Sequence, residues 1–389
     1  MPIKVLYIAT GGIYGADQSL MTLLDGLGDK ITACVVMPHL FGLQNFLEQR
    51  KIPYAKIRMR QYSVPKIKSV KDFIYFPVKL FMALRYNNII AYRLKKIIRD
   101  FQPDIIHTNV GVYRMGYKIA RQRGIPHVWH LREYQDTDMG RWIVGGRKRL
   151  VRLLKRDNNY PIPVSKGIAD YFGIPHSHVV YNGILKKDHL LFHPKKENYF
   201  LYAGNIYEEK GVSVMIEAFC RFASHNNSYK LYLAGGYSRS YKNKLMRIIS
   251  RYHIQTDRIL FIGKQLRDEI TRLMSKATGV IVPSYCEAFG RVVAEAMANG
   301  CLVIAHNSHG IKEQLDNGRS ITGDEIGIRC TSSAEDMAEK MQEIITNGIP
   351  HYFPMINRSQ QVVNQLYTSA KYSREIYEVY CSQLNIFVP

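Results

Sequence analysis

The sequence lacks any long uninterrupted hydrophobic run. No stretch of about 18 apolar residues, the length that a membrane-spanning helix requires, occurs in the chain. The chain begins with Met1-Pro-Ile-Lys4 and a strand-like run, without the apolar segment and small-residue cleavage site of a secretory signal. These absences argue against a membrane-spanning or secreted protein, and we expect a cytoplasmic one.

Closely spaced cysteines are also missing. The six cysteines are far apart and form no C-x-x-C pair, which argues against both a zinc site and a disulfide framework. We expect reduced cysteines, most of them in the core. The chain also lacks a D-x-D motif on a predicted cleft loop and any tight cluster of His and Asp, so no metal site is predicted.

Acidic residues are few relative to basic ones. The chain has 32 Asp and Glu against 54 Lys and Arg, a net charge of +22 that favours anionic partners: nucleic acid, anionic lipid or phosphorylated substrates. Half of this excess lies between Lys56 and Arg99, which contain twelve basic residues and one acid. Aromatic residues from Tyr62 to Tyr92 are interleaved with these cations. A second cluster, from Arg141 to Arg156, has seven cations and no acid.

Basic and aromatic residues together are typical of a surface that docks on an anionic membrane. We therefore hypothesise that the protein is peripheral to the inner face of the membrane. The plain alternative for either cluster is a solvated, basic helix face.

Short apolar runs alternate with helical patterns along the whole chain, which predicts parallel sheets covered by helices. At 389 residues the chain is too long for one core, so we expect two doubly wound α/β domains. The predicted division is 1–184, a polar linker 185–198, a second domain 199–361, and a C-terminal helix 362–389 that crosses back to the first domain. The runs predicted as strands are KVLYIAT, ITACVVMP, DIIHTN, HVWHL, YPIPVS and HVVYNG, then YFLYAGN, KLYLAGG, RILFIG, GVIVPS, CLVIAHN and GIRCT.

The most informative stretch runs from Val282 to Gly300. A buried strand is predicted to end at Ser284, a loop carries Glu287, and a helix begins near Gly290 with Glu295 on its second turn. The free N–H groups and the dipole of a helix start suit a diphosphate, and a glycine lets the diphosphate approach closely.

These residues carry a resemblance. E-A-F-G followed by E-A-M-A-x-G resembles the E-x7-E signature of the retaining GT-B glycosyltransferases of family 4. In that family the first glutamate contacts the donor sugar, the second contacts the donor ribose, and the backbone after the first binds the diphosphate. The resemblance implies donor-site roles for Glu287 and Glu295, and for the backbone of Ala288, Phe289 and Gly290.

A second match is Gly204-Asn205-Ile-Tyr-Glu-Glu-Lys210-Gly211, which is similar to the family's G-R-x-x-x-x-K-G. Its basic pair neutralises the donor phosphates. Lys210 fits this role, but Asn205 stands where the family usually has arginine. Arg291 and Lys264 are the candidates to replace the missing cation.

The first domain matches the family more loosely. Gly11-Gly12-x-x-Gly15-Ala16 resembles its glycine-rich first turn, which implies a donor contact at Gly12 and an acceptor-side position for Gly15. His130 corresponds to a histidine that points toward the transferred sugar. The other residues predicted on the acceptor side are Asn109, Arg132 and Glu133.

The resemblance implies a GT-B fold, in which two Rossmann-like domains face each other across a cleft. It also implies metal-independent, retaining transfer of a sugar, with Glu287, Lys210 and His130 as the catalytic residues. We expect no cofactor, a UDP- or GDP-linked sugar as co-substrate, and a glycan or lipid-linked acceptor of cell-surface polysaccharide synthesis such as lipopolysaccharide or capsule.

Two other kinds of function remain open. A nucleic-acid-binding protein would use the same positive charge, but no known nucleic-acid module is present and the donor motifs would go unexplained. A nucleotide-sugar epimerase or hydrolase would share the architecture. An NAD-dependent enzyme is disfavoured because the first turn lacks G-x-G-x-x-G spacing.

Overall fold

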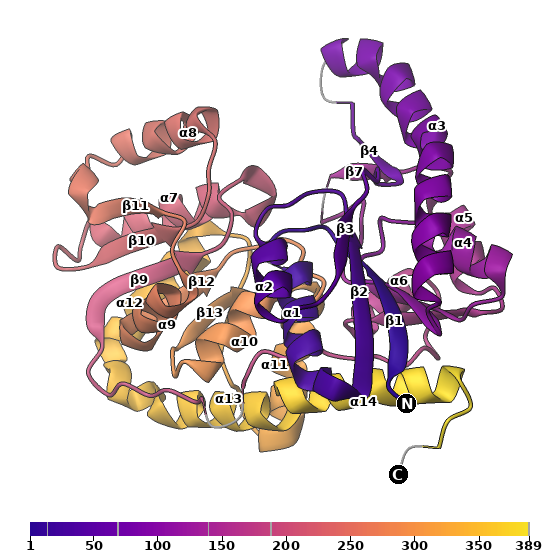
Figure 1. Cartoon of the computed structure of the whole chain (residues 1–389). Helices are drawn as coiled ribbons and strands as arrows, with labels where there is room; N and C mark the ends of the chain where they lie inside the picture. The colour runs from indigo at the N-terminus through magenta and orange to yellow at the C-terminus, as the bar shows by residue number, and fades with distance from the viewer. Residues whose placement is uncertain (14, 68–69, 139, 187–188, 388–389) are drawn as a thin grey trace. The chain divides into compact units, whose positions relative to one another are not determined.

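The chain folds into two compact units, residues 1–183 with 369–389 and residues 184–368. The computed structural model describes residues 1–13, 15–67, 70–138, 140–186 and 189–387, without the side chains of 70–72, 82–89 and 256. Figure 1 shows the elements of both units along the chain.

The first unit is built on a parallel sheet in the order β3-β2-β1-β5-β6-β8, the doubly wound Rossmann order. A two-stranded antiparallel ribbon, β4 with β7, accompanies it. Its strands are β1 (Ile3–Ile8), β2 (Ile31–Met37), β3 (Tyr54–Lys56), β4 (Ser63–Pro65), β5 (Ile105–Thr108), β6 (His127–Leu131), β7 (Arg141–Ile143) and β8 (Asn159–Pro163). Its helices are α1 (Ala16–Leu27), α2 (Leu43–Gln49), α3 (Val70–Phe101), α4 (Met115–Arg123), α5 (Gly146–Leu154), α6 (Lys166–Tyr171) and α14 (Ser369–Gln383).

Both faces of this sheet are buried, which explains why its strands read as continuous apolar runs. Successive side chains of a strand point to opposite faces, so Val5 and Tyr7 of β1 belong to one core and Leu6 and Ile8 to another. Helices α1, α2 and α14 cover the first face, and α3 with α4 covers the second. A Cβ at Gly26 of α1 would lie 2.0 Å from the hydroxyl oxygen of Ser373, so a glycine is needed where α1 meets α14.

The second unit repeats the same plan, with a parallel sheet in the order β11-β10-β9-β12-β13-β14. Its strands are β9 (Glu197–Ala203), β10 (Lys230–Ala234), β11 (Ile259–Gly263), β12 (Ala277–Val282), β13 (Val303–His306) and β14 (Ile328–Cys330). Its helices are α7 (Val212–Ala223), α8 (Arg239–Ser250), α9 (Arg267–Lys276), α10 (Arg291–Ala298), α11 (His309–Thr322), α12 (Ala334–Asn347) and α13 (Phe353–Leu366). All six strands predicted here are confirmed.

Two predictions for regular elements are wrong. The run HVVYNG, residues 178–183, is not a strand, because it pairs with no neighbour in the sheet and only the Val180 N–H bonds to the Pro163 carbonyl, at 3.1 Å. The helix predicted over 362–389 is two helices, α13 and α14. The helix breaks at Tyr367. The Tyr367 carbonyl accepts hydrogen bonds from the N–H groups of Ile184 and Leu185, at 2.7 and 3.1 Å, instead of bonding within a helix.

The first basic segment forms most of α3, the longest helix described. Figure 1 shows its first turns extending beyond the sheet of the first unit. Among the described helices, α3 included, none is apolar over enough residues to cross a membrane. Lys68 of the basic segment lies outside the described residues, as do the side chains of Lys71, Arg85 and Tyr86.

Five of the six cysteines are buried as free thiols, and only Cys286 is partly exposed. This agrees with the expectation that most of the cysteines lie in the core.

Candidate functional site

Lys210 and Glu287 form an ion pair at the carboxyl ends of two neighbouring strands, β9 and β12. These strands flank the point where the strand order of the second unit reverses, which is where open α/β sheets bind ligands. Gly211 brings the two loops together: its φ is +67°, and a Cβ there would lie 2.2 Å from the Pro283 carbonyl oxygen. Both charged side chains stay about one-fifth exposed, at 22% and 23%, so a ligand can reach them.

The loop that carries Glu287 is held from behind by α11. The Gly310 N–H donates to the Glu287 carbonyl at 2.9 Å, and the Gln314 side-chain amide donates to the carbonyls of Phe289 and, at 3.1 Å, Gly290. Gln314 is almost completely buried. Because these carbonyls are satisfied inside the protein, the loop has its conformation before any ligand binds.

Helix α10 begins immediately after Gly290, whose φ of +84° is the left-handed conformation that glycine adopts without strain. The first N–H groups of a helix have no acceptor within the helix, so this start can bind an anion. Glu295, one turn further on, pairs with Arg291 at 3.0 Å. The buried Phe289 ring packs edge-on against Tyr367, at 5.2 Å between ring centroids, so its side chain anchors the loop.

Lys264 lies beside Asn205, the position where a cation was missing from the sequence pattern. The N–H of Ile206 bonds to the Gly236 carbonyl at 2.8 Å, which joins the loops after β9 and β10. A Cβ at Gly236 would lie 2.9 Å from Lys264 Cε and 3.5 Å from Asn205 Oδ1. Of the two candidate replacements, Lys264 is therefore next to Asn205, whereas Arg291 is engaged with Glu295.

Sequence reasoning missed the residues at and after the end of β13. His306 Nδ1 lies 3.2 Å from the Ser284 carbonyl, and the Ser308 hydroxyl donates to the Tyr285 carbonyl at 2.9 Å. Together with Gly310 and Gln314 they hold the Glu287 loop. A usable signal was present, because polar residues that directly follow a buried strand lie at the same sheet edge as the other strand ends.

In the first unit the glycine-rich turn is closed by a buried carboxylate. Asp17 accepts the N–H of Gly12 at 2.6 Å and that of Thr10 at 3.1 Å, as well as the Thr10 hydroxyl. Gly11 packs so closely that a Cβ would lie 1.9 Å from the His39 carbonyl oxygen. The Gly12 N–H, predicted to contact the donor, is thus donated within the protein, while Gly15 caps the start of α1.

Arg132 is the centre of a hydrogen-bond network on the predicted acceptor side. Its guanidinium donates to the Asn109 carbonyl at 3.1 Å, to the Tyr372 hydroxyl at 2.6 Å and to the side-chain oxygen of Asn182. Asn109 in turn donates to the Ala16 carbonyl at 2.9 Å. This network ties the carboxyl ends of the strands to α1 and α14, so the edge of the sheet is rigid and polar.

His130 is completely buried beside this network. Its ring stacks on His107 with 5.6 Å between centroids, and its Nδ1 lies 3.2 Å from an Arg132 nitrogen. Burial, and secondarily the Arg132 charge, lowers the pKa of His130 well below 6.5, so the ring is neutral. Because guanidinium only donates, Nδ1 accepts and the proton is on Nε2. The role of His130 in orienting the sugar stays a prediction.

Glu133 faces a different loop from Arg132. Its Oε1 accepts the Val112 N–H at 3.2 Å. Burial, with a smaller effect from Asp138, raises the pKa of Glu133 to about 8. Near neutral pH this carboxyl therefore carries a proton in a large share of the molecules.

The structure thus places the predicted residues in two groups, one at the strand ends of each unit. Glu287, Lys210, Lys264, Asn205 and the start of α10 lie together in the second unit. The residues from the first unit surround Arg132 and the glycine-rich turn. Within the described ranges, no group of three or more His, Cys, Asp or Glu side chains is placed to hold a metal ion.

Residues 186–362 match the family described as glycosyl transferases group 1. An uncharacterized glycosyltransferase of Methanocaldococcus jannaschii, MJ1178, is 26% identical over 69% of this chain and 73% of its own length. The lipopolysaccharide 1,2-N-acetylglucosaminetransferase of Salmonella typhimurium is 35% identical over 32% of this chain and 33% of its own length.

Among solved structures, that of Anabaena HepE in complex with UDP and glucose is similar, with a TM-score of 0.78 at 18% identity. It covers 98% of this chain and 100% of that one. The likeness, together with the two doubly wound sheets, confirms the GT-B fold.

Proposed function

From the match of residues 186–362 to the group 1 glycosyltransferases, we propose that the chain transfers a sugar, with retention of configuration, from a UDP- or GDP-linked donor to a lipid-linked glycan. The observation that carries the donor half is the Lys210–Glu287 pair beside the start of α10. These groups meet at one switch point. The cation and the helix start suit the diphosphate of the donor, and the carboxylate suits the hydroxyls of its sugar.

Catalysis rests on the departure of the nucleoside diphosphate. As the bond from the sugar to the phosphate breaks, negative charge grows on the phosphate oxygens, and Lys210, Lys264 and the first amides of α10 stabilise it. Glu287 orients the sugar, and the acceptor hydroxyl attacks from the face that the diphosphate leaves. The acceptor proton passes to a departing phosphate oxygen. No metal ion takes part in this scheme, so a chelator should leave the activity unchanged.

The binding of the donor is tested first. A thermal-shift panel of UDP-, GDP-, ADP- and CMP-sugars identifies the nucleotide, and UDP-glucose is a natural first compound because HepE was crystallised with UDP and glucose. The selected donor is then used to measure transfer and slow hydrolysis. Nuclear magnetic resonance of the product reports the anomeric configuration, and an inverted product would exclude retention.

Lys210→Ala tests the mechanism. Removing a preorganised donor to a developing charge costs about 3 kcal/mol, so we expect roughly a hundredfold loss of kcat. Lys340→Ala is the matched control, because Lys340 pairs with Glu343 at 3.0 Å on α12 in the same unit and has no part in the proposed site. Normal turnover by Lys210→Ala would end the assignment.

The same assays separate the alternatives. An epimerase converts the nucleotide sugar without an acceptor, and a hydrolase releases free sugar at a rate that no acceptor increases. A nucleic-acid-binding protein would show no shift with any nucleotide sugar.

We propose further that the protein works at the cytoplasmic face of a membrane. The first half of α3 has five strongly exposed apolar or aromatic side chains, and membrane insertion would remove them from water. They are Phe73, Ile74, Tyr75, Val78 and Phe81. Sedimentation with anionic vesicles should show salt-sensitive binding, and its absence would exclude this part of the proposal.

A further inference from the structure

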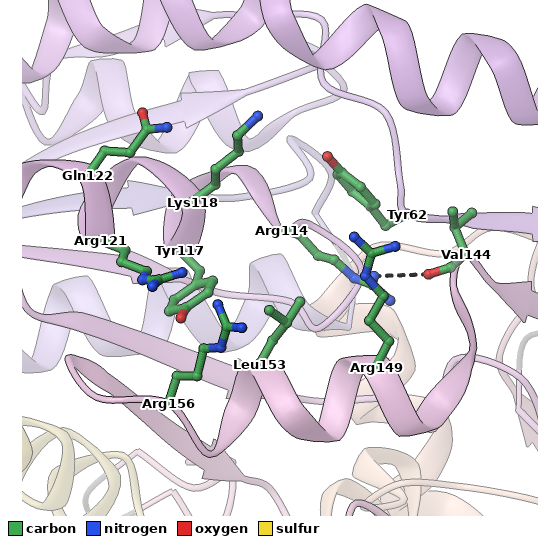
Figure 2. A pocket seen from close by; sticks show the side chains of 10 residues that line it. All are labelled: Tyr62, Arg114, Tyr117, Lys118, Arg121, Gln122, Val144, Arg149, Leu153 and Arg156. Atoms are coloured by element: carbon green, nitrogen blue, oxygen red, sulfur yellow. Dashed lines mark hydrogen bonds between the residues drawn. The ribbon is translucent and has the colours of Figure 1, made fainter.

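The first unit contains a cavity of about 600 Å³ outside the site described above. It lies between α4 and α5, and Figure 2 shows the side chains that line it. This volume is in the usual range for a small-molecule site. None of its lining residues is acidic, and five are cationic. The lining consists of Tyr62, Arg114, Tyr117, Lys118, Arg121, Gln122, Val144, Arg149, Leu153 and Arg156.

The floor of the cavity is made of buried hydrogen-bond donors. Arg114 is only 6% exposed, and one of its nitrogens donates to the Val144 carbonyl at 2.9 Å. Its guanidinium carbon lies over the Tyr62 ring, 5.2 Å from the ring centroid. Its Nε and other terminal nitrogen have no hydrogen-bond partner among the described residues, nor has the buried Tyr117 hydroxyl. Buried donors without a partner are costly, so a group that accepts hydrogen bonds here would be strongly favoured.

The rim of the cavity adds exposed positive charge. Lys118, Arg121, Arg149 and Arg156 are exposed side chains around the cavity. Figure 2 shows the guanidinium groups of Arg114 and Arg149 drawn close together, and burial, then the charge of Arg149, lowers the pKa of Arg114 to about 10. The two cations repel each other and no lining residue is acidic, so an anion bound in the cavity would be attracted by both.

The cavity wall continues into the exposed apolar surface of α3. Tyr62 and Val144 flank the β4–β7 ribbon and are joined by a hydrogen bond of 3.0 Å. On the same ribbon Trp142 is half exposed and packs edge-on against Phe76 of α3, at 5.7 Å. A ligand with a charged head and an apolar tail matches this order of cations and exposed aromatics.

We propose that this cavity binds the diphosphate group of a membrane lipid, with the lipid chain directed along the β4–β7 ribbon toward α3. Five cations with no acid exceed what a phosphodiester headgroup of one charge can neutralise, and a terminal diphosphate fits them better. The inference rests on the proposed function in taking this lipid as the carrier of the acceptor glycan. It does not depend on the donor chemistry.

The test compares the full-length chain with the double variant Arg121→Gln/Arg149→Gln. Both side chains are exposed, so the fold should survive. The control is Arg123→Gln, which removes a charge from the same helix α4 but not from the cavity lining. Flotation is measured with phosphatidylcholine vesicles that contain a polyprenyl diphosphate, and with phosphatidylglycerol vesicles of equal surface charge.

We expect the polyprenyl diphosphate to recruit the wild type and Arg123→Gln, and the double variant at least about tenfold more weakly, which corresponds to about 1.4 kcal/mol. Inorganic pyrophosphate should compete. Because the donor site also suits a diphosphate, competition is repeated in a Lys210→Ala background and should persist there. Equal recruitment of wild type and double variant, or equal recruitment by both vesicles, would overturn the proposal. Binding of pyrophosphate without recruitment to the lipid would overturn the lipid as its source.

Failure here and failure of the proposed function are distinguishable. If the cavity is not a lipid site, the thermal shift with the nucleotide sugar and the effect of Lys210→Ala remain. If the protein is not a transferase, no acceptor receives sugar from any nucleotide sugar, whereas recruitment to the polyprenyl diphosphate is measured without any donor.

Discussion

Gly310→Ala should damage the donor site although Gly310 has no assigned contact with the donor. The φ of Gly310 is not positive, so alanine is compatible with its backbone, but the new Cβ would lie 2.4 Å from the Ala288 carbonyl oxygen and 2.8 Å from that of Glu287. Ordinary contact begins at 3.4 Å, so the loop must retreat by about 1 Å. A displacement of this size at a reacting centre can lower turnover about a hundredfold, or about 2.7 kcal/mol. Strain of this kind should also cost about 1 to 3 kcal/mol of stability.

The assay is kcat and KM for the donor identified by thermal shift, together with urea unfolding. Gly279→Ala is the matched control, because it lies in β12 of the same unit and its Cβ would make only ordinary contacts, at 3.5 Å. We expect normal activity for the control and a fall in kcat for Gly310→Ala. Wild-type kcat for Gly310→Ala would refute the reasoning that α11 positions Glu287.

Three further predictions concern single side chains. Gln314→Leu leaves the buried carbonyls of Phe289 and Gly290 without a donor and should cost about 1 to 3 kcal/mol in urea unfolding; an unchanged midpoint would contradict this. Because the pKa of Glu133 is raised, its contribution to the free energy of unfolding is present below pH 4.5 and lost as the pH rises toward about 8. Over this window the unfolding free energy of Glu133→Gln should therefore fall less than that of the wild type. Burial lowers the pKa of His127 to about 4, so its contribution to the free energy of unfolding is present above pH 6.5 and lost as the pH falls toward 4. Between these pH values the unfolding free energy of His127→Gln should decrease less than that of the wild type.

The fold was predictable because its signals are local. Strands buried on both faces appear as apolar runs, and the helices between them appear as periodic patterns, so all six strands of the second unit were found. Failures occurred where tertiary contacts replace a local pattern. Val180 is buried like a strand residue yet pairs with no neighbouring strand, and the helix over 362–389 breaks because the chain arriving at Ile184 takes the Tyr367 carbonyl.

The candidate site was predictable in part for the same reason. Glu287, Gly290 and Glu295 lie within nine residues of one another in the sequence, so their spacing along a loop and a helix could be read directly. The role of Gln314 in holding the Glu287 loop could not be predicted. A glutamine in a helix is ordinarily a surface residue, and no neighbouring residue in the sequence indicates which groups it bonds to.

By itself, the sequence determined the alternation of strands and helices, the glycines at the sharp turns and the order of the donor motif, since each depends on residues a few positions apart. Only the tertiary structure decided that Lys210 meets Glu287, that Lys264 lies beside Asn205, and that Arg114 shares a cavity with Arg149. These partners are separated by tens of residues. These contacts form because of the strand order and the close packing at a few glycines. Neither can be predicted from a local sequence pattern.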